Sequence, residues 1–147
     1  MKYIIVDLDN CISDDKYRRK WLEAEGMNRK DQLALYHINC IYDNYHPIEF
    51  TEENQLIIFT GRPEIYRKFT KKWLKVYDIK YKGLYMRPKE NYDKSPELKE
   101  KMLMSLLEFD PIAEIVMVYD DRKEILDMYR KFNIPVTIKQ INDYGTK

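Results

Sequence analysis

The chain opens with a short apolar run that ends in two acidic residues. Ile4, Ile5 and Val6 are followed by Asp7, and Asp9 comes two positions later. A run this short and rich in β-branched residues indicates a buried strand. Because ligands of open α/β sheets bind beyond the carboxyl ends of the strands, we expect both acids to lie at a ligand site. Two neighbouring carboxylates repel each other, so we also expect a cation or a shared proton between them.

Strand-like and helix-like segments alternate along the rest of the chain. This alternation predicts an α/β fold of the three-layer, Rossmann-like kind, with a mainly parallel sheet between two layers of helices. The pair Ser95-Pro96 is a typical helix start, because Ser is a good N-cap and Pro suits the first helical position. We expect strands at 2–7, 55–60, 83–87, 114–119 and 135–139, and helices at 63–77, 96–108 and 122–132.

About 40 residues separate the first two expected strands, which is far more than a usual connection between elements. Their helical spacing predicts a small helical cap at about 12–52 that covers the site. No repeat or linker interrupts the chain, so we expect a single domain over residues 1–147. The aromatic side chains of the insert would either pack in its core, as is usual at helical spacing, or stack on a base. They are Tyr17, Trp21, Tyr36, Tyr42 and Tyr45.

The composition is that of a globular domain that buries its own core. Of the 147 residues, 44% are hydrophobic and 35% are charged. No apolar run approaches the roughly 20 residues that cross a bilayer, so we expect no membrane association. Cys11 and Cys40 form neither a CxxC nor a zinc-ligand spacing. With no signal pattern at the start of the chain, these features predict a reduced, cytoplasmic location.

Charge is unevenly spread although the net charge is only +1. Residues 62–101 hold 13 Lys and Arg against 6 Asp and Glu, whereas both flanking regions are acidic. This basic block is either a solvated helix face or a surface that attracts a polyanion such as nucleic acid.

Polar residues follow the second and third expected strands as well. Thr60-Gly61-Arg62 supplies a hydroxyl, a turn and a guanidinium group where a helix is expected to begin. Helix N-termini favour anions and Arg binds phosphate oxygens in pairs, so this tripeptide is a candidate phosphate site, although it could simply cap a helix. Arg87 closes the third strand and is a further candidate.

Asp120 and Asp121 follow the fourth expected strand. They either cap the next helix or supply the hard oxygen ligands that Mg²⁺ prefers. Lys99 lies in the helix between the third and fourth strands. A lysine on a helix is usually a solvated surface charge.

Taken together, these residues resemble the haloacid dehalogenase (HAD) superfamily of aspartate-nucleophile phosphatases. Asp7-Leu8-Asp9 resembles its first motif, Thr60 with Arg62 its second, Lys99 its third and Asp120-Asp121 its fourth. The motifs occur in the family's order and cover nearly the whole chain. Asn10-Cys11 departs from the pattern, because the family usually has Gly-Thr or Gly-Val there.

Within this superfamily the chain most resembles the 3′-phosphatase domain of phage polynucleotide kinases. The residues that carry this likeness are TGR with the basic aromatic helix after it, Met86-Arg87, Lys99-Glu100-Lys101, and DDR followed by Met128-Tyr129-Arg130. No GxxxxGK[ST] occurs, so we expect no P-loop kinase domain in this chain. The likeness implies a phage protein that acts in the host cytoplasm.

The resemblance also implies a mechanism. Asp7 would attack phosphorus to form an aspartyl-phosphate, and Asp9 would serve as general acid and then as general base. Mg²⁺ would be held by Asp7, the backbone carbonyl of Asp9 and at least one of Asp120 and Asp121. The residues implied in binding the phosphoryl group or the rest of the substrate are Thr60, Gly61, Arg62, Arg87 and Lys99.

The expected substrate is a nucleotide-type phosphomonoester, with the 3′-phosphate of a DNA or RNA end as the lead candidate. A nucleoside monophosphatase, whose insert would close over one base and sugar, is the near alternative. Two other classes are a phosphoacceptor signalling domain and an inactive nucleic-acid binder. A signalling domain lacks the second acid two positions after the acceptor, and retention of both Asp7 and Asp9 argues against an inactive binder.

Three further residues invite a chemical role that we do not expect them to have. His37 and His46 are nine positions apart and have no ligand spacing, so packing or capping is the expected role. Cys11 has no neighbouring His that would support a thiolate, and we expect a small apolar filler.

Overall fold

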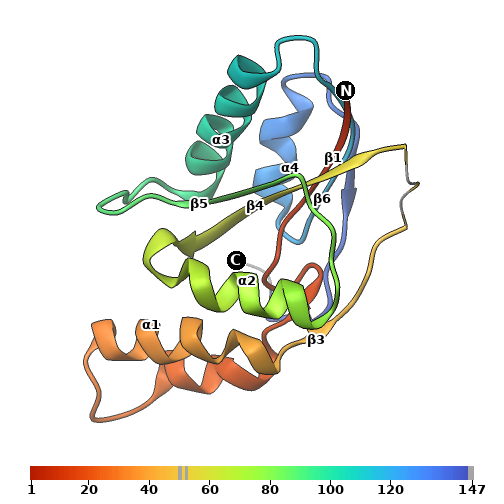
Figure 1. Ribbon diagram of the computed structural model, residues 1–147. Helices are drawn as coiled ribbons and strands as arrows, with labels where there is room; N and C mark the ends of the chain where they lie inside the picture. Colours follow the sequence, from red (N-terminus) through yellow and green to blue (C-terminus); the bar gives the residue numbers. More distant parts are fainter. Residues whose placement is uncertain (50, 52, 146–147) are drawn as a thin grey trace.

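The computed structural model describes residues 1–49, 51 and 53–145 and contains a five-stranded sheet in the order β5-β4-β1-β6-β7 (Figure 1). Every neighbouring pair of strands in this sheet is parallel, which confirms the predicted α/β fold. The strands are β1 (Lys2–Val6), β4 (Gln55–Pro63), β5 (Gly83–Arg87), β6 (Glu114–Asp120) and β7 (Val136–Ile138).

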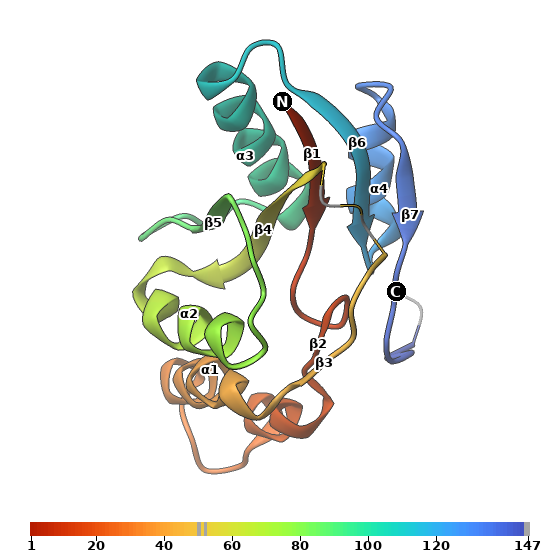
Figure 2. The same ribbon diagram turned by 45° about the vertical axis from the view of Figure 1, so that its right-hand side comes forward.

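Helices cover both faces of the sheet (Figures 1 and 2). Side chains of β1 alternate between the faces, so that Tyr3 and Ile5 join one buried cluster while Ile4 and Val6 join the other. The first cluster lies under α3 (Ser95–Phe109) and α4 (Lys123–Arg130), and the second lies under α2 (Arg67–Val76). The first strand is therefore buried on both sides, as its continuous apolar run predicts.

The insert between β1 and β4 forms a small helical unit beyond the carboxyl end of β1 (Figure 2). Two short antiparallel strands, β2 (Ser13–Asp14) and β3 (Asn44–Tyr45), close its base. Between them lie the 3₁₀ helix η1 (Lys16–Glu23), the α-helix α1 (Arg29–Ile38) and the 3₁₀ helix η2 (Asn39–Tyr42).

Backbone atoms at the base of the insert tie it to α2. The carbonyl of Asp43 accepts hydrogen bonds from Trp73 Nε1 at 2.9 Å and from the hydroxyl of Tyr77 at 3.0 Å. Of the insert aromatics, Tyr36 is buried whereas Tyr17 and Tyr42 are exposed. The expectation that these rings pack in a core therefore fails for Tyr17 and Tyr42.

The second strand of the sequence differs from its predicted boundary. It continues through Thr60-Gly61-Arg62 to Pro63, and its pairing with β5 shifts register between Phe59 and Pro63. A 3₁₀ turn, η3 (Glu64–Tyr66), then precedes α2, so the helix begins at Arg67 and not at 63. Pro63 is itself extended, with a φ of −64° and a ψ of 141°, so no helical turn can begin before Glu64.

The start of α3 also differs from the prediction. Lys94 occupies the N-cap position and Ser95 is already helical, with no capping hydrogen bond from a side chain. The Ser95 hydroxyl instead accepts a hydrogen bond from Arg122 Nη1 at 3.2 Å. Among the described helices, none is both long enough and apolar enough to cross a membrane.

Candidate active site

The carboxyl ends of β1 and β6 bring Asp7 and Asp120 together around one lysine. The backbone N–H of Asp7 donates to the carbonyl of Tyr119 at 3.1 Å, which fixes the two strand ends side by side. From α3, Lys99 Nζ donates to Asp7 Oδ1 at 2.9 Å and to Asp120 Oδ2 at 2.6 Å. All three side chains are buried, so Lys99 is not the solvated surface charge that a helical lysine usually is.

A third carboxylate joins this cluster. Asp7, Asp120 and Asp121 each place an oxygen so that the three lie within 4.8 Å of one another. Burial, opposed by Lys99 and reinforced by repulsion from Asp120, raises the pKa of Asp7. Burial and repulsion from Asp7 raise the pKa of Asp121. Three acids around one ammonium leave an excess of negative charge, and their hard oxygens fit a divalent cation such as Mg²⁺.

Asp9 lies on the other side of the loop and contacts two arginines. Arg62 donates to Asp9 Oδ1 from Nε at 3.0 Å and from Nη2 at 2.6 Å, and Arg18 Nη2 contacts the same oxygen. Burial would raise the pKa of Asp9, but the two guanidinium groups outweigh it and hold that pKa well below its usual range. The carboxylate of Asp9 is therefore ionised in this state.

The two arginines belong to a network in which only Asp9 is partly exposed. Arg18 donates from Nε to Asp43 Oδ1 at 2.9 Å and from Nη2 to Asp43 Oδ2 at 2.8 Å. Arg62 reaches Thr70 Oγ1 at 3.1 Å and Ser13 Oγ at 3.3 Å. Both guanidinium groups are fully buried, and the carboxylates of Asp9 and Asp43 balance their charge, as buried ions require.

Sequence reasoning missed Arg18 and Asp43. Both lie in the insert, where charged residues at helical spacing indicate a solvated surface. No short motif surrounds either residue. The only available signal was that an insert over an active site has to contact the catalytic loop at some point.

The remaining predicted residues divide between the cavity and its surroundings. Gly61 lines the cavity, whereas Thr60 is buried and its hydroxyl accepts from the Arg62 backbone N–H at 3.1 Å. Arg87 donates to the Gly61 carbonyl at 3.4 Å and to Asn91 Oδ1 at 2.8 Å. Neither Arg62 nor Arg87 is among the side chains that line the cavity.

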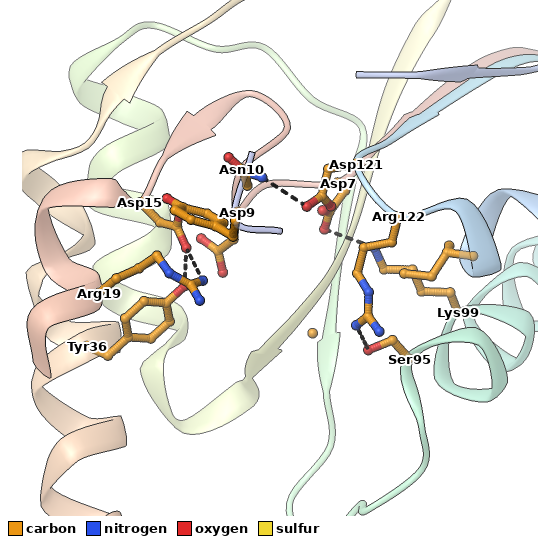
Figure 3. A pocket seen from close by; sticks show the side chains of 13 residues that line it. Asp7, Asp9, Asn10, Asp15, Arg19, Tyr36, Ser95, Lys99, Asp121 and Arg122 are labelled. Atoms are coloured by element: carbon orange, nitrogen blue, oxygen red, sulfur yellow. Dashed lines mark hydrogen bonds and ion pairs between the residues drawn. The ribbon is translucent and has the colours of Figure 1, made fainter. Parts of the chain in front are cut away.

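A cavity of about 210 Å³ lies between the insert and the sheet domain. Figure 3 shows Asp15, Arg19 and Tyr36 on the insert side, and Ser95, Lys99 and Arg122 on the other. Asp7, Asp9, Asn10, Gly61 and Asp121 complete the lining together with Ile125 and Tyr144. The structure therefore brings both motif acids, the lysine and one of the late acids to a single concave site.

The residue after Asp9 explains the departure from the superfamily pattern. Asn10 has a φ of 62°, in the left-handed region where Gly is most at ease and Asn is tolerated. Its Oδ1 accepts from the backbone N–H of Asn142 at 2.8 Å, and its Nδ2 donates to the Asn142 carbonyl at 2.9 Å and to Asp121 Oδ2 at 3.3 Å. Asn10 thus keeps the glycine conformation and adds contacts that hold the loop.

Within the described residues, the one cluster that could hold a metal ion contains neither histidine nor Cys11. His37 stacks on Tyr66 at a centroid distance of 5.1 Å, and burial lowers its pKa to about 3, so it is neutral. His46 is exposed and lies 3.9 Å from Asp14. Cys11 is buried, and burial raises the pKa of its thiol. His37 and Cys11 therefore pack as expected from the sequence, whereas no packing or capping role is seen for His46 among the described residues.

Known proteins resemble this chain over nearly its whole length. A protein of Autographa californica nuclear polyhedrosis virus, assigned as a bifunctional polynucleotide kinase/RNA ligase, is 26% identical over 145 residues, which is 96% of this chain and 20% of that protein. A chain of the Pnkp1/Rnl/Hen1 RNA repair complex matches with a TM-score of 0.73 at 22% identity, over 97% of this chain and 43% of that one. The chain therefore spans less than half the length of these relatives.

A second solved structure matches more evenly. A haloacid dehalogenase-like hydrolase from Streptococcus pneumoniae has a TM-score of 0.59 at 16% identity, over 91% of this chain and 82% of that one. The family of the polynucleotide kinase PNKP phosphatase domain matches residues 1–144. The chain thus belongs to the family of the PNKP phosphatase domain, within the HAD-type phosphatases.

Proposed function

We propose that this domain is a Mg²⁺-dependent phosphomonoesterase that removes the 3′-phosphate from DNA or RNA ends. The observation that carries the proposal is that one loop presents two acids, Asp7 and Asp9, whose charged partners differ. Asp7 lies against Lys99 in the acidic cluster, whereas Asp9 is held ionised by Arg18 and Arg62. A nucleophile and a proton-transfer group are needed for a phosphomonoester to react through an enzyme-bound phosphate.

In the first half-reaction Asp7 Oδ attacks phosphorus. The new bond from oxygen to phosphorus forms as the bond to the departing 3′-oxygen breaks, and Asp9 delivers a proton to that oxygen. Lys99 and the Thr60 hydroxyl offset charge on the phosphoryl oxygens. In the second half-reaction a water attacks phosphorus, Asp9 takes its proton, and the bond to Asp7 breaks to release inorganic phosphate.

The low pKa of Asp9 suits the second step directly, because an ionised carboxylate is ready to act as a base. For the first step the carboxyl has to be protonated. The negative charge of an incoming phosphate raises the pKa of a nearby acid and so favours its protonated form. Arg62 therefore acts on Asp9 in this proposal, and its role in contacting phosphate oxygens gives way to a positioning role.

Three carboxylates are available for the metal. Asp7, Asp120 and Asp121, together with the backbone carbonyl of Asp9, would hold Mg²⁺. When bound, the cation shields the anionic nucleophile from the anionic phosphate and stabilises transition-state charge.

Two observations support a polynucleotide end as the substrate. The relatives named above are a polynucleotide kinase/RNA ligase and a member of an RNA repair complex. In addition, Lys68, Lys71, Lys72 and Lys75 lie on one exposed face of α2 and line a groove of about 450 Å³, which also contains the ion pair of Asp78 with Lys80. Within the described part of the chain, no acidic group lies within ion-pair distance of these four lysines, unlike the Lys123–Asp127–Arg130 set on α4. Such a face attracts a phosphodiester backbone.

The second candidate is a nucleoside monophosphatase. It is favoured by the two tyrosines, Tyr36 and Tyr144, that line the cavity and could enclose a single nucleoside. One relative is a viral protein, and the expected phage origin and cytoplasmic location stay predictions.

The deciding experiment compares two substrates with Mg²⁺. Release of inorganic phosphate is measured from a 3′-phosphorylated oligonucleotide and from free 3′- and 5′-mononucleotides, with EDTA and the Asp7→Asn variant as blanks. The proposal expects the higher kcat/KM for the oligonucleotide and no turnover with EDTA. Preference for a 5′-mononucleotide would favour the second candidate, and turnover by Asp7→Asn would reject the nucleophile.

A further inference from the structure

The insert side of the cavity carries an arginine and a tyrosine that the proposed mechanism does not use. We propose that Arg19, stacked on Tyr144, forms a subsite for the nucleobase of the terminal nucleotide, the one that carries the phosphate. This inference rests on the proposed function and names the part of the substrate that the site recognises. It predicts that the enzyme distinguishes an end with a base from an end without one.

Asp15 fixes the aromatic part of this subsite. Its carboxylate is buried, with one oxygen accepting from the Tyr144 hydroxyl at 2.7 Å and the other from the Tyr36 hydroxyl at 2.6 Å. Both phenols therefore donate to Asp15, which lines the same cavity. Further support comes from Asn142, whose Nδ2 donates to the Tyr144 hydroxyl at 3.1 Å and to Asp14 Oδ1 at 2.7 Å. The Tyr144 ring is thus held from two sides before any substrate arrives.

The guanidinium group of Arg19 stacks on the Tyr144 ring. Its Cζ lies 3.9 Å from the centroid of Tyr144, and 41% of the Arg19 side chain is exposed. Its only ion pair among the described residues is a long one, 3.5 Å to Asp15. Arg18, one position earlier, is by contrast fully buried between two carboxylates. The guanidinium of Arg19 therefore keeps an open face at the mouth of the cavity.

The size of the cavity decides which part of a nucleotide meets Arg19. About 210 Å³ is below the roughly 300–1,000 Å³ of pockets that enclose a whole small ligand. The phosphate has to reach Asp7 and Lys99 at the inner end, so the base remains at the mouth. Bases stack on aromatic rings and on arginine planes in single-stranded nucleic-acid sites. A base, Arg19 and Tyr144 then form a three-layer stack.

The test uses two oligonucleotides that differ only at the 3′-phosphorylated terminal residue, which carries a base in one and is abasic in the other. Stacking of one base predicts about a tenfold higher kcat/KM for the first with the wild-type protein. Arg19→Ala should remove that preference by lowering kcat/KM on the base-bearing end while leaving the abasic end unchanged. Arg19→Lys, which keeps the charge but loses the plane, should behave like Arg19→Ala.

Lys20→Ala is the matched control. Lys20 lies in the same 3₁₀ helix with its Nζ 4.4 Å from the centroid of Tyr17, but that pair does not line the cavity. It should retain the wild-type preference. Because Arg19 is partly exposed, its variants should keep the wild-type melting temperature, which is measured alongside the kinetics.

Equal turnover of the two ends by the wild type would overturn the subsite, and so would full recovery of the preference by Arg19→Lys. An equal fall in kcat/KM on the base-bearing and the abasic end in Arg19→Ala would likewise overturn it, because Arg19 would then act on the phosphate. If the wild type hydrolyses neither oligonucleotide, the proposed function fails instead. The same comparison between a nucleoside monophosphate and ribose phosphate then decides the subsite.

Discussion

The guanidinium group of Arg18 contacts the carboxylate of Asp9, although Arg18 belongs to the helical insert and Asp9 to the loop after β1. The same guanidinium binds Asp43 at the base of the insert. The insert therefore does more than cover the cavity, since it helps to set the ionisation of a group in the proposed reaction.

Arg18→Ala should lower the free energy of unfolding by about 3–5 kcal/mol, because the buried Asp43 loses its hydrogen-bonded cation and keeps only Arg62 at 3.7 Å. Urea denaturation followed by circular dichroism measures this loss. Arg29→Ala, on the exposed surface of the same insert, should change stability by less than about 0.5 kcal/mol. Equal losses in the two variants would contradict the buried network.

Asp7→Asn should lower kcat by at least about a thousandfold, because an amide oxygen is a poor nucleophile. The fold should survive, since the amide has the same shape and relieves repulsion from Asp120 and Asp121. Phosphate release and thermal melting are measured on one preparation. A melting temperature well below that of the wild type would mean that Asp7 also holds the fold.

Asp9→Asn should cost more on an alkyl phosphate than on p-nitrophenyl phosphate. An alkoxide needs a proton to depart, whereas nitrophenolate leaves readily without one. The ratio of kcat/KM values for the two substrates is the readout. Equal losses on both would argue against Asp9 as the acid.

Stability should fall as the pH falls from about 6.5 to about 3, because of His37. Burial lowers the pKa of His37 to about 3 in the folded protein, so in this window the unfolded chain binds a proton that the folded one refuses. That difference lowers the free energy of unfolding by about 1.4 kcal/mol per pH unit. The free energy of unfolding of the wild type is compared with that of His37→Phe at each pH. The contributions of all other titrating groups cancel in the difference between the two. The difference should be flat above pH 7 and slope below it, and a flat line throughout would refute the prediction.

The lysine face of α2 should make oligonucleotide turnover sensitive to salt. The double variant Lys71→Ala/Lys75→Ala should raise KM for a 3′-phosphorylated oligonucleotide and flatten the slope of log kcat/KM against log salt by about 1.4, or about 0.7 per lost charge. Mononucleotide turnover should not change. Lys123→Ala/Arg130→Ala on α4, where Asp127 pairs with both cations, is the control and should keep the wild-type slope.

The sheet and the acidic cluster could be predicted because their signals are local. The apolar run before Asp7 and the strand end at Asp120 each place an acid at the carboxyl edge of a parallel sheet, and family likeness adds Lys99. The partners of Asp9 could not be predicted in this way. Arg18 reaches it from a 3₁₀ helix without a motif, and its burial depends on Asp43 at 25 positions' distance.

The exact ends of the strands and the irregular segments could not be predicted from the sequence either. The extension of β4 to Pro63 depends on tertiary pairing with β5, which propensity alone does not contain. Residues 141–144 have no periodic pattern, yet Tyr144 lines the cavity and Asn142 holds Asn10 in the catalytic loop. Such contacts emerge only once the chain has folded.

The hydrogen bonds between Asn10 and Asn142 span 132 positions of sequence. A ribosome delivers Asp7 and Asp9 at the outset of synthesis, but the turn that aims them lacks this brace until residue 142 has left the exit tunnel. The nascent polypeptide should therefore gain full catalytic activity only after residue 142 has emerged.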